Sequence, residues 1–257
     1  MKTNATSRRK FIGSSILGLS AYSLAWSNQP PQNLPHYRLA LARSDTTYYI
    51  CESGNLGKDS TFTLGLLSVP ASGEFEDRIW QLRRQSNYFP RLTFGSNDRF
   101  QVPLAQQVIS WLLEESNTRF QVMAFSEPIT SNNSHFPDAP SRWQLLQQKQ
   151  AYYDQLLAKA KVQNSMVHVK YQSPLGPSPA YAQHFFSSHK VYYQATDTRT
   201  SNALQICGLL TSCVAAAHTG RPLSPIKATL VEHLQQVLDN QQVRPAMYWK
   251  DRFVFYT

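Results

Sequence analysis

The sequence contains only three cysteines, Cys51, Cys207 and Cys213, in 257 residues. Three thiols cannot build a disulfide framework or a closed zinc site, although an oxidising compartment would allow one bridge and leave one thiol. The histidine spacings of zinc proteases are absent as well. Ser53 lies in Glu-Ser-Gly, which lacks the first glycine of the Gly-x-Ser-x-Gly elbow, so the sequence also argues against a serine hydrolase.

Acidic residues are scarce too. The chain has 16 Asp and Glu against 25 Lys and Arg, which gives a formal net charge of +9. The first 28 residues contain four of the basic residues, Lys2, Arg8, Arg9 and Lys10, and no acid, so the remainder carries a charge of +5. This mild excess is compatible with a polyanionic partner and equally with none.

No apolar stretch reaches the roughly 20 residues of a membrane-spanning helix. The longest, residues 11–25, follows Ser7-Arg8-Arg9-Lys10 and is thinned by glycines and serines. A basic start, a moderately apolar run and a polar stretch that contains proline are the parts of a bacterial export signal. The paired arginines are typical of the twin-arginine type, which carries folded proteins. Cleavage is expected after Ser23-Leu24-Ala25 or, as a second choice, after Ala25-Trp26-Ser27.

The predicted organisation is a twin-arginine signal peptide over residues 1–28, a linker with a candidate first strand over 29–45, and one domain over 46–257. The protein is then periplasmic or secreted, or membrane-anchored if the signal is not cleaved. Residues 7–12 would contact the export machinery, and no transmembrane span is expected in the mature chain. A fortuitous basic start of a cytosolic protein is the alternative.

Strand and helix patterns alternate along the rest of the chain. β-rich runs predict strands at 38–53, 60–69, 119–126, 166–172, 190–196 and 246–257, the last as a strand or a short hairpin. Apolar residues at helical spacing predict helices at 73–85, 102–116, 140–160, 201–218 and 224–241. Strands that alternate with helices after an opening hairpin indicate an α/β fold with a mixed sheet.

Two motifs resemble the domain-of-unknown-function 3800 family. YYICESGNLG followed by FTLGLL is similar to that family's opening strands, which end in Asp-Glu-Ser-Gly and read Phe-x-Leu-Gly. ATDTRTSNALQICGLL resembles its Asp-Ser stretch followed by Leu-Gln-Leu-Ala-Asp at the start of a helix. Most of the likeness is carried by Ser53-Gly54, Gly65, Asp197 and Leu204-Gln205. The resemblance implies a ribonuclease-H-like mixed sheet flanked by helices, with Mg²⁺ or Mn²⁺ held on acidic residues for nucleic-acid hydrolysis.

The acids that such a site needs are largely replaced here. Cys51 stands where the family has its first carboxylate, Gly208 where it has the last, and Arg91 where a mid-chain acid is common. Two hard cations need several converging carboxylates, and only Glu52 and Asp197 survive at or beside matched positions. Since neighbouring strand residues point to opposite faces, Glu52 is expected to face away from Cys51. We therefore expect a degenerate metal site without a cofactor, which favours a protein that is not an enzyme but leaves the question open. Mg²⁺ or Mn²⁺ would be bound only under the hydrolase alternative given below.

Cys51 has other interpretations. It could be a nucleophile with a histidine as base, and His168 on the fourth strand is the nearest candidate. It could also be a buried structural cysteine, which is the commoner case. The family layout further implies that Cys207 lies near Cys51, and the sequence leaves open whether the two thiols form a disulfide.

Arginines concentrate on the first helix and directly after it, at Arg78, Arg83, Arg84, Arg91 and Arg99. Such a cluster can hold the backbone of a nucleic acid or another polyanion. The ordinary alternative is a solvated polar face of a helix that is apolar on its other side. The Pro-rich aromatic segment 172–189 is expected either to cover the cleft or to bind a partner.

The sequence thus favours an exported, non-catalytic binding or scaffold protein that derives from a metal-dependent nuclease fold and binds nucleic acid or another polyanion. The alternative is an exported hydrolase or nuclease that uses a rearranged site around Cys51, Glu52 and Asp197. A third interpretation is a structural accessory to another envelope protein. The sequence names no specific ligand, partner or oligomeric state.

Overall fold

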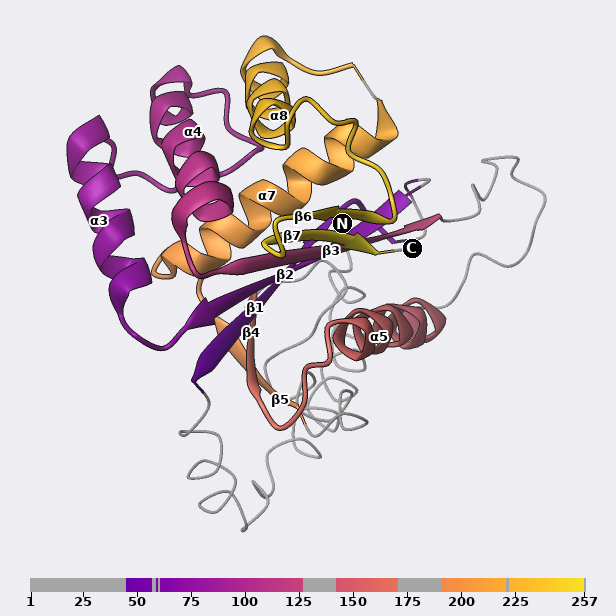
Figure 1. The fold of residues 1–257 in the computed structure, drawn as a ribbon. Helices are drawn as coiled ribbons and strands as arrows, with labels where there is room; N and C mark the ends of the chain where they lie inside the picture. Colours follow the sequence, from indigo (N-terminus) through magenta and orange to yellow (C-terminus); the bar gives the residue numbers. More distant parts are fainter. Residues whose placement is uncertain are drawn as a thin grey trace, which may run out of the picture. The chain divides into compact units, whose positions relative to one another are not determined.

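The described part of the chain is built on one mixed sheet of seven strands, seen in the computed structural model in Figure 1. The structure describes residues 45–56, 59, 61–126, 142–170, 191–220 and 222–256. They all belong to one compact unit. The predicted export signal, nearly all of the predicted linker, the segment 172–189 and part of the first turn lie outside the described residues.

The strand order in the sheet is β5-β4-β1-β2-β3-β7-β6. Three successive antiparallel strands form the centre, β4 and β5 extend it in parallel from β1, and β7 pairs in parallel with β3 and carries the antiparallel β6. The strands are β1 Thr46–Ser53, β2 Thr61–Pro70, β3 Arg119–Ser126, β4 Met166–Lys170, β5 Tyr192–Thr196, β6 Met247–Trp249 and β7 Phe253–Tyr256.

Helices cover both faces of this sheet. In Figure 1, α3, α4, α7 and α8 lie on one face and α5 lies on the other. The helices are α3 Glu74–Ser86, α4 Val102–Ser110, α5 Arg142–Lys159, α7 Asn202–Thr219 and α8 Pro225–Val237. A 3-10 turn, Arg99–Gln101, precedes α4, and a π turn, Trp111–Glu115, follows it. In the described residues no helix is both long enough and apolar enough to cross a bilayer.

The alternation of side chains along the strands divides the core into two layers. Cys51 and Leu67 pack with the layer of α3, α4, α7 and α8, whereas Ile50 and Leu66 pack with α5. Helix α7 lies directly on β1 and β2, where Gly65 has no side chain to hold it away. A Cβ at Gly65 would overlap Thr211 and lie 2.9 Å from the ring of Phe120. The absence of a side chain at this one strand position therefore lets α7 lie against the sheet.

The predicted fold class, α/β with a ribonuclease-H-like mixed sheet flanked by helices, is confirmed. The third predicted strand coincides with β3, and the helix expected at 73–85 is α3, shifted by one residue. The C-terminal segment forms a hairpin, one of the two predicted forms, and its strand β7 joins the sheet beside β3.

Candidate functional site at the start of helix α7

Cys51 on β1 meets Cys207 and Gly208 on α7. The Cys51 thiol donates a hydrogen bond to the carbonyl of Leu204 at 3.3 Å and is also hydrogen-bonded to Cys207. A Cβ placed on Gly208 would lie 3.7 Å from Cys51 Sγ. The expected proximity of Cys51 and Cys207 is confirmed, and all three cysteines are free thiols. Cys51 and Gly208 stand at the first and last ligand positions that the family resemblance implies. These two residues thus pack directly against each other.

This environment keeps the Cys51 thiol protonated. Its hydrogen bond with Cys207 and its burial raise the pKa of Cys51 well above the usual range. A nucleophilic cysteine needs the opposite shift, because the thiolate is the reactive form. His168 lies beside Tyr49 in the sheet, stacks on that ring at 4.9 Å between centroids and bonds Thr196 Oγ1 through Nδ1 at 2.8 Å. Cys51 therefore bonds Leu204 and Cys207, whereas His168 bonds Thr196. The two residues do not form a nucleophile–base pair.

Glu52 points to the opposite face of the sheet, as expected from strand alternation. Its Oε1 lies 2.6 Å from Lys149 Nζ and accepts a hydrogen bond from the Tyr153 hydroxyl at 2.5 Å. Both partners belong to α5. Burial and then the charge of Glu52 raise the pKa of Tyr153 well above its usual range, so its hydroxyl stays a donor. Glu52 anchors α5 to β1 and cannot join the face on which Cys51 lies.

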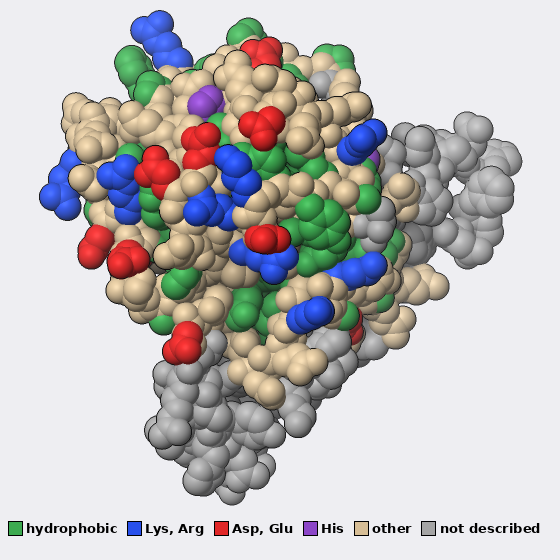
Figure 2. Space-filling view, viewed as in Figure 1, with side chains coloured by type: hydrophobic (Ala, Val, Ile, Leu, Met, Phe, Trp, Pro, Cys, Tyr) green, Lys and Arg blue, Asp and Glu red, His purple; other side chains and the backbone are tan. Residues whose placement is uncertain are grey.

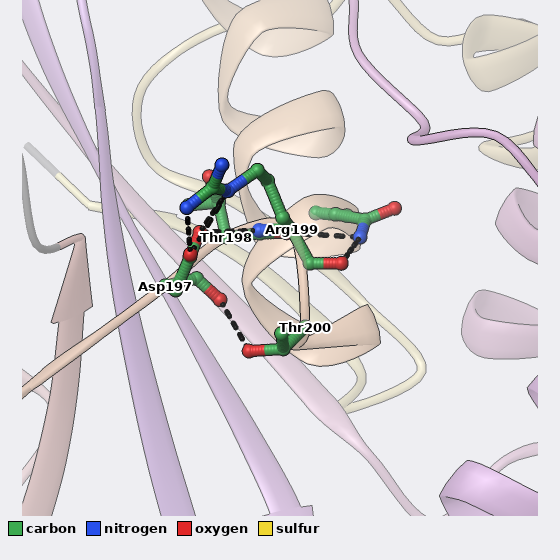
Figure 3. A network of polar contacts seen from close by, with 5 residues as sticks. Asp197, Thr198, Arg199 and Thr200 are labelled. Carbon is green, nitrogen blue, oxygen red and sulfur yellow. Dashed lines mark hydrogen bonds and ion pairs between the residues drawn. The ribbon is translucent and has the colours of Figure 1, made fainter.

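Asp197 follows β5 in the turn that leads into α7, shown in Figure 3. Its carboxylate accepts hydrogen bonds from the backbone N–H of Arg199 at 2.8 Å and from Nη2 of the same residue at 2.7 Å. These bonds, with a smaller contribution from the charge of Arg91, lower the pKa of Asp197. The carboxylate is thus ionised, and Arg199 already neutralises it.

The residues present do not fit the two-metal site that the family resemblance implies. Cys51 offers a protonated thiol in a closed contact, Gly208 offers no side chain, and Glu52 lies across the sheet. Within the described ranges, no three His, Cys, Asp or Glu residues come together as a metal site. Hard cations such as Mg²⁺ need several oxygen ligands that converge, and Asp197 alone does not supply them.

One of the five predicted anion-binding arginines is not on the surface. Arg83 is only 2% exposed, and its guanidinium donates to Asn202 Oδ1 at 3.0 Å, Gln205 Oε1 at 2.9 Å and the carbonyl of Pro90 at 2.8 Å. Its assignment to an anion-binding surface is therefore wrong. The helical pattern contained the signal, since position 83 adjoins Leu82 and lies four residues after Ile79 on the buried side of α3.

Gln205 is the partner that sequence reasoning missed. Its Oε1 also accepts from the backbone N–H of Leu92 at 2.9 Å, and its Nε2 donates to the carbonyl of Thr198 at 2.9 Å. A single amide thereby joins the α3–α4 connection to the turn before α7. Gln205 belongs to the Leu-Gln motif, so the motif itself marked the position but not its role.

The remaining predicted arginines face solvent to different degrees. Arg84, Arg91 and Arg99 are exposed, and Arg78 is half-buried and bonds Gln81 Oε1 at 2.7 Å. The face seen in Figure 2 shows basic, acidic and hydrophobic side chains interspersed with one another. These four arginines remain candidates for contact with an anionic ligand.

Comparisons with known proteins identify no family for this chain. No family model matches the chain, and no curated protein matches it. The resemblance to the domain-of-unknown-function 3800 family therefore remains a hypothesis. Among solved structures, the chain is similar to a ribonuclease H2 from Pyrococcus horikoshii OT3, with 12% sequence identity and a TM-score of 0.39 over 80% of this chain and 95% of that chain. The fold assignment rests on the strand order of the sheet and not on this similarity.

Proposed function

We propose that this protein is a non-catalytic binding protein on a ribonuclease-H-like scaffold. One observation carries the proposal. Where α7 packs on β1, a protonated thiol and a glycine occupy the two facing positions that, by the family resemblance, would supply carboxylates for metal-dependent hydrolysis. Two-metal chemistry uses one ion to activate water and another to hold the leaving oxygen. Among the residues that the structure describes, neither ion has a ligand set.

We expect a lower affinity for Mg²⁺ than that of a site with all its carboxylates, because of the chemistry of the residues present. Cysteine is a soft ligand that suits zinc or copper better than magnesium. Arg199 is ion-paired with Asp197, and the charge of Arg91 also acts on that carboxylate, so both oppose the approach of a cation. A geometric reason argues against the rearranged site of the alternative hydrolase. Glu52 and Cys51 lie on opposite faces of β1 and cannot act on one substrate.

The ligand class that we propose is nucleic acid or another polyanion. The chain after residue 28 carries a formal net charge of +5, and three exposed arginines lie on α3 and the segment that follows it. Phosphate groups are bound by such side chains without any requirement for catalysis.

A cleavage assay tests the non-catalytic proposal. The protein is incubated with labelled single-stranded and double-stranded oligonucleotides in Mg²⁺ and in Mn²⁺, beside an Asp197→Asn variant and an authentic nuclease as positive control. We expect no cleavage by either form. Metal-dependent cleavage by the wild type that Asp197→Asn abolishes would establish the hydrolase alternative instead.

We also propose that the chain is exported in a folded state by the twin-arginine route, with residues 1–28 as the signal. The support is the Arg8-Arg9 pair ahead of a mildly apolar run. Replacing both arginines by lysine keeps the charge and should leave the protein in the cytoplasm of a bacterial host. Equal periplasmic recovery of the two forms would refute the assignment.

A further inference from the structure

Large aromatic side chains are exposed at one region of the described surface. Trp80 is 46% exposed, Phe89 54% and Phe100 67%. The described chain has one further exposed side chain of this class, Tyr248, on β6. Exposing one large apolar side chain is ordinary, whereas several in one region mark an interaction surface. Three of these four rings belong to α3 and its connection to α4.

Buried polar contacts hold Trp80 and Phe89 near each other. The Arg83 guanidinium lies 6.0 Å from the centroid of the Trp80 ring, and its Nη1 donates to the carbonyls of Phe89 at 3.3 Å and Pro90 at 2.8 Å. The same guanidinium therefore lies beside the Trp80 ring and bonds the backbone of Phe89. Its own bonds to Asn202 and Gln205 on α7 anchor it to the core.

Phe100 is connected to the same segment through Asp98. The Asp98 carboxylate accepts from the backbone N–H of Phe100 at 2.9 Å and is hydrogen-bonded to Tyr88. The Arg99 guanidinium lies 5.1 Å from the centroid of the Phe100 ring. The three rings are thus displayed on backbone whose positions are already set by hydrogen bonds, which lowers the entropic cost of binding.

The charge between the rings is positive. From Trp80 to Phe100 the chain has four arginines and a single acid, Asp98. Asp98 is engaged with Phe100 and Tyr88, and Arg83 is buried, so the exposed charges of this stretch are Arg84, Arg91 and Arg99. We call the six residues Trp80, Arg84, Phe89, Arg91, Arg99 and Phe100 the aromatic–arginine surface.

We propose that the aromatic–arginine surface binds single-stranded nucleic acid, with bases stacked on the three rings and phosphates paired with the three arginines. Sequence-tolerant single-strand binding combines these two groups, because every base has a π face and every linkage a negative charge. A duplex hides its base faces and would use only the arginines. Protein interfaces also enrich aromatic residues and arginine, so the test below compares the oligonucleotide with an acidic polypeptide. The inference rests on the proposed function in that it takes binding, and not hydrolysis, as the activity.

The test measures fluorescence anisotropy of a labelled oligothymidylate of about 16 nucleotides titrated with the full-length protein, at several salt concentrations. Replacing Trp80, Phe89 or Phe100 by alanine should weaken binding by about 5- to 100-fold each. Each of the variants Arg84→Gln, Arg91→Gln and Arg99→Gln should reduce the slope of log K against log salt concentration by about one. Tyr248→Ala and Arg244→Gln are the matched controls, since both side chains are exposed and lie outside the surface. Neither should change the affinity.

Several outcomes would overturn the proposal. They are absence of binding at low salt, binding that the ring substitutions leave unchanged, and binding of a duplex or heparin as tight as that of the single strand. Tighter binding of polyglutamate would point instead to an acidic protein partner. Because the cleavage assay is separate, a protein that neither cuts nor binds the oligonucleotide would refute this surface while the non-catalytic proposal stands.

Discussion

Arg83 illustrates how one residue can be charged and yet belong to the core. Burial lowers the pKa of its guanidinium, with the neighbouring Tyr88 and Glu76 acting in the opposite sense. A buried charge is tolerated only when hydrogen bonds replace its lost water. Two side-chain oxygens and the carbonyls of 88–90 do so here. This residue therefore supports the surface above it and does not itself offer a charge to solvent.

Replacing Arg83 by methionine should lower the free energy of unfolding by about 3 kcal/mol, because it leaves several buried acceptors without a donor. Arg84→Met is the matched control, since the adjacent arginine is exposed, and it should change stability by less than about 0.5 kcal/mol. Urea denaturation of both variants gives the comparison. Equal effects would mean that the network around Arg83 contributes nothing.

Cys51 is the residue that decides the chemistry of the face covered by α7. Cys51→Asp would restore the family's carboxylate in a closed contact, where burial raises the carboxyl pKa above that of the unfolded chain. An acid with a raised folded pKa is destabilising once the unfolded form ionises. The unfolding free energy of Cys51→Asp should therefore fall as pH rises above about 4.

The matched control for that experiment is Cys51→Asn, which has nearly the same shape and no titration. Urea denaturation at several pH values compares the two variants. The difference in stability between Asp and Asn should grow from acidic to neutral pH. A difference that is independent of pH would show that water or a cation reaches this position, contrary to the closed contact.

At the scale of elements, β1 connects the two helical layers through neighbouring residues. Cys51 contacts α7 on one face, and Glu52 binds Lys149 and Tyr153 of α5 on the other. The Lys149 side chain is largely buried, and its ammonium is ion-paired with Glu52. Lys149 Nζ also lies 5.9 Å from the centroid of the Tyr153 ring. Helix α5 is thereby held to the sheet by a polar anchor as well as by apolar packing.

Glu52→Gln should destabilise the protein by about 2–3 kcal/mol, since it removes the carboxylate charge that faces the largely buried Lys149 ammonium. Lys149→Met alone should also destabilise it, whereas the double variant should recover part of the loss. A double-mutant cycle measured by thermal or urea unfolding gives the coupling. Strictly additive effects would indicate that the ion pair is too hydrated to matter.

At the scale of the whole molecule, the packing of α7 on the sheet organises the fold. This helix buries eleven of its residues and contacts the three central strands of the sheet as well as α3 and α8. At its N-terminal end, Asn202 bonds Arg83 of α3, and Gln205 bonds the backbone N–H of Leu92 in the α3–α4 connection. A change that moves α7 away from β2 should therefore disturb the core and the aromatic–arginine surface together.

Gly65→Ala tests this dependence. Its methyl group would meet Thr211 and Phe120 in packed surroundings, and we expect a loss of about 3 kcal/mol or more. Gly95→Ala is the control, because a Cβ there has its nearest neighbour at 3.8 Å. Thermal unfolding of the two variants should separate them clearly. A stable Gly65→Ala protein would show that α7 can shift without cost.

Much of the fold could be predicted from local patterns. Alternation and helical spacing place β3 and α3 within a residue of their observed bounds, and they place Ile79 and Leu82 inside the core. They also place Glu52 and Cys51 on opposite faces of one strand. The parallel pairing of β7 with β3 was not foreseen, because the register joins segments more than 100 residues apart and no local pattern specifies a partner strand.

The sequence by itself determined which residues point inward and which ligand positions lack carboxylates, since both are local properties of the chain. Only the tertiary structure decided what each inward residue meets. The helical spacing places Arg83 on the buried side of α3, but its partners Asn202 and Gln205 lie more than 100 residues away in the sequence. The contact of Cys51 with Gly208 is decided in the same way, by the path of α7 across the sheet. Periodicity specifies a face, whereas a partner depends on how distant segments pack, and packing is a property of the whole chain.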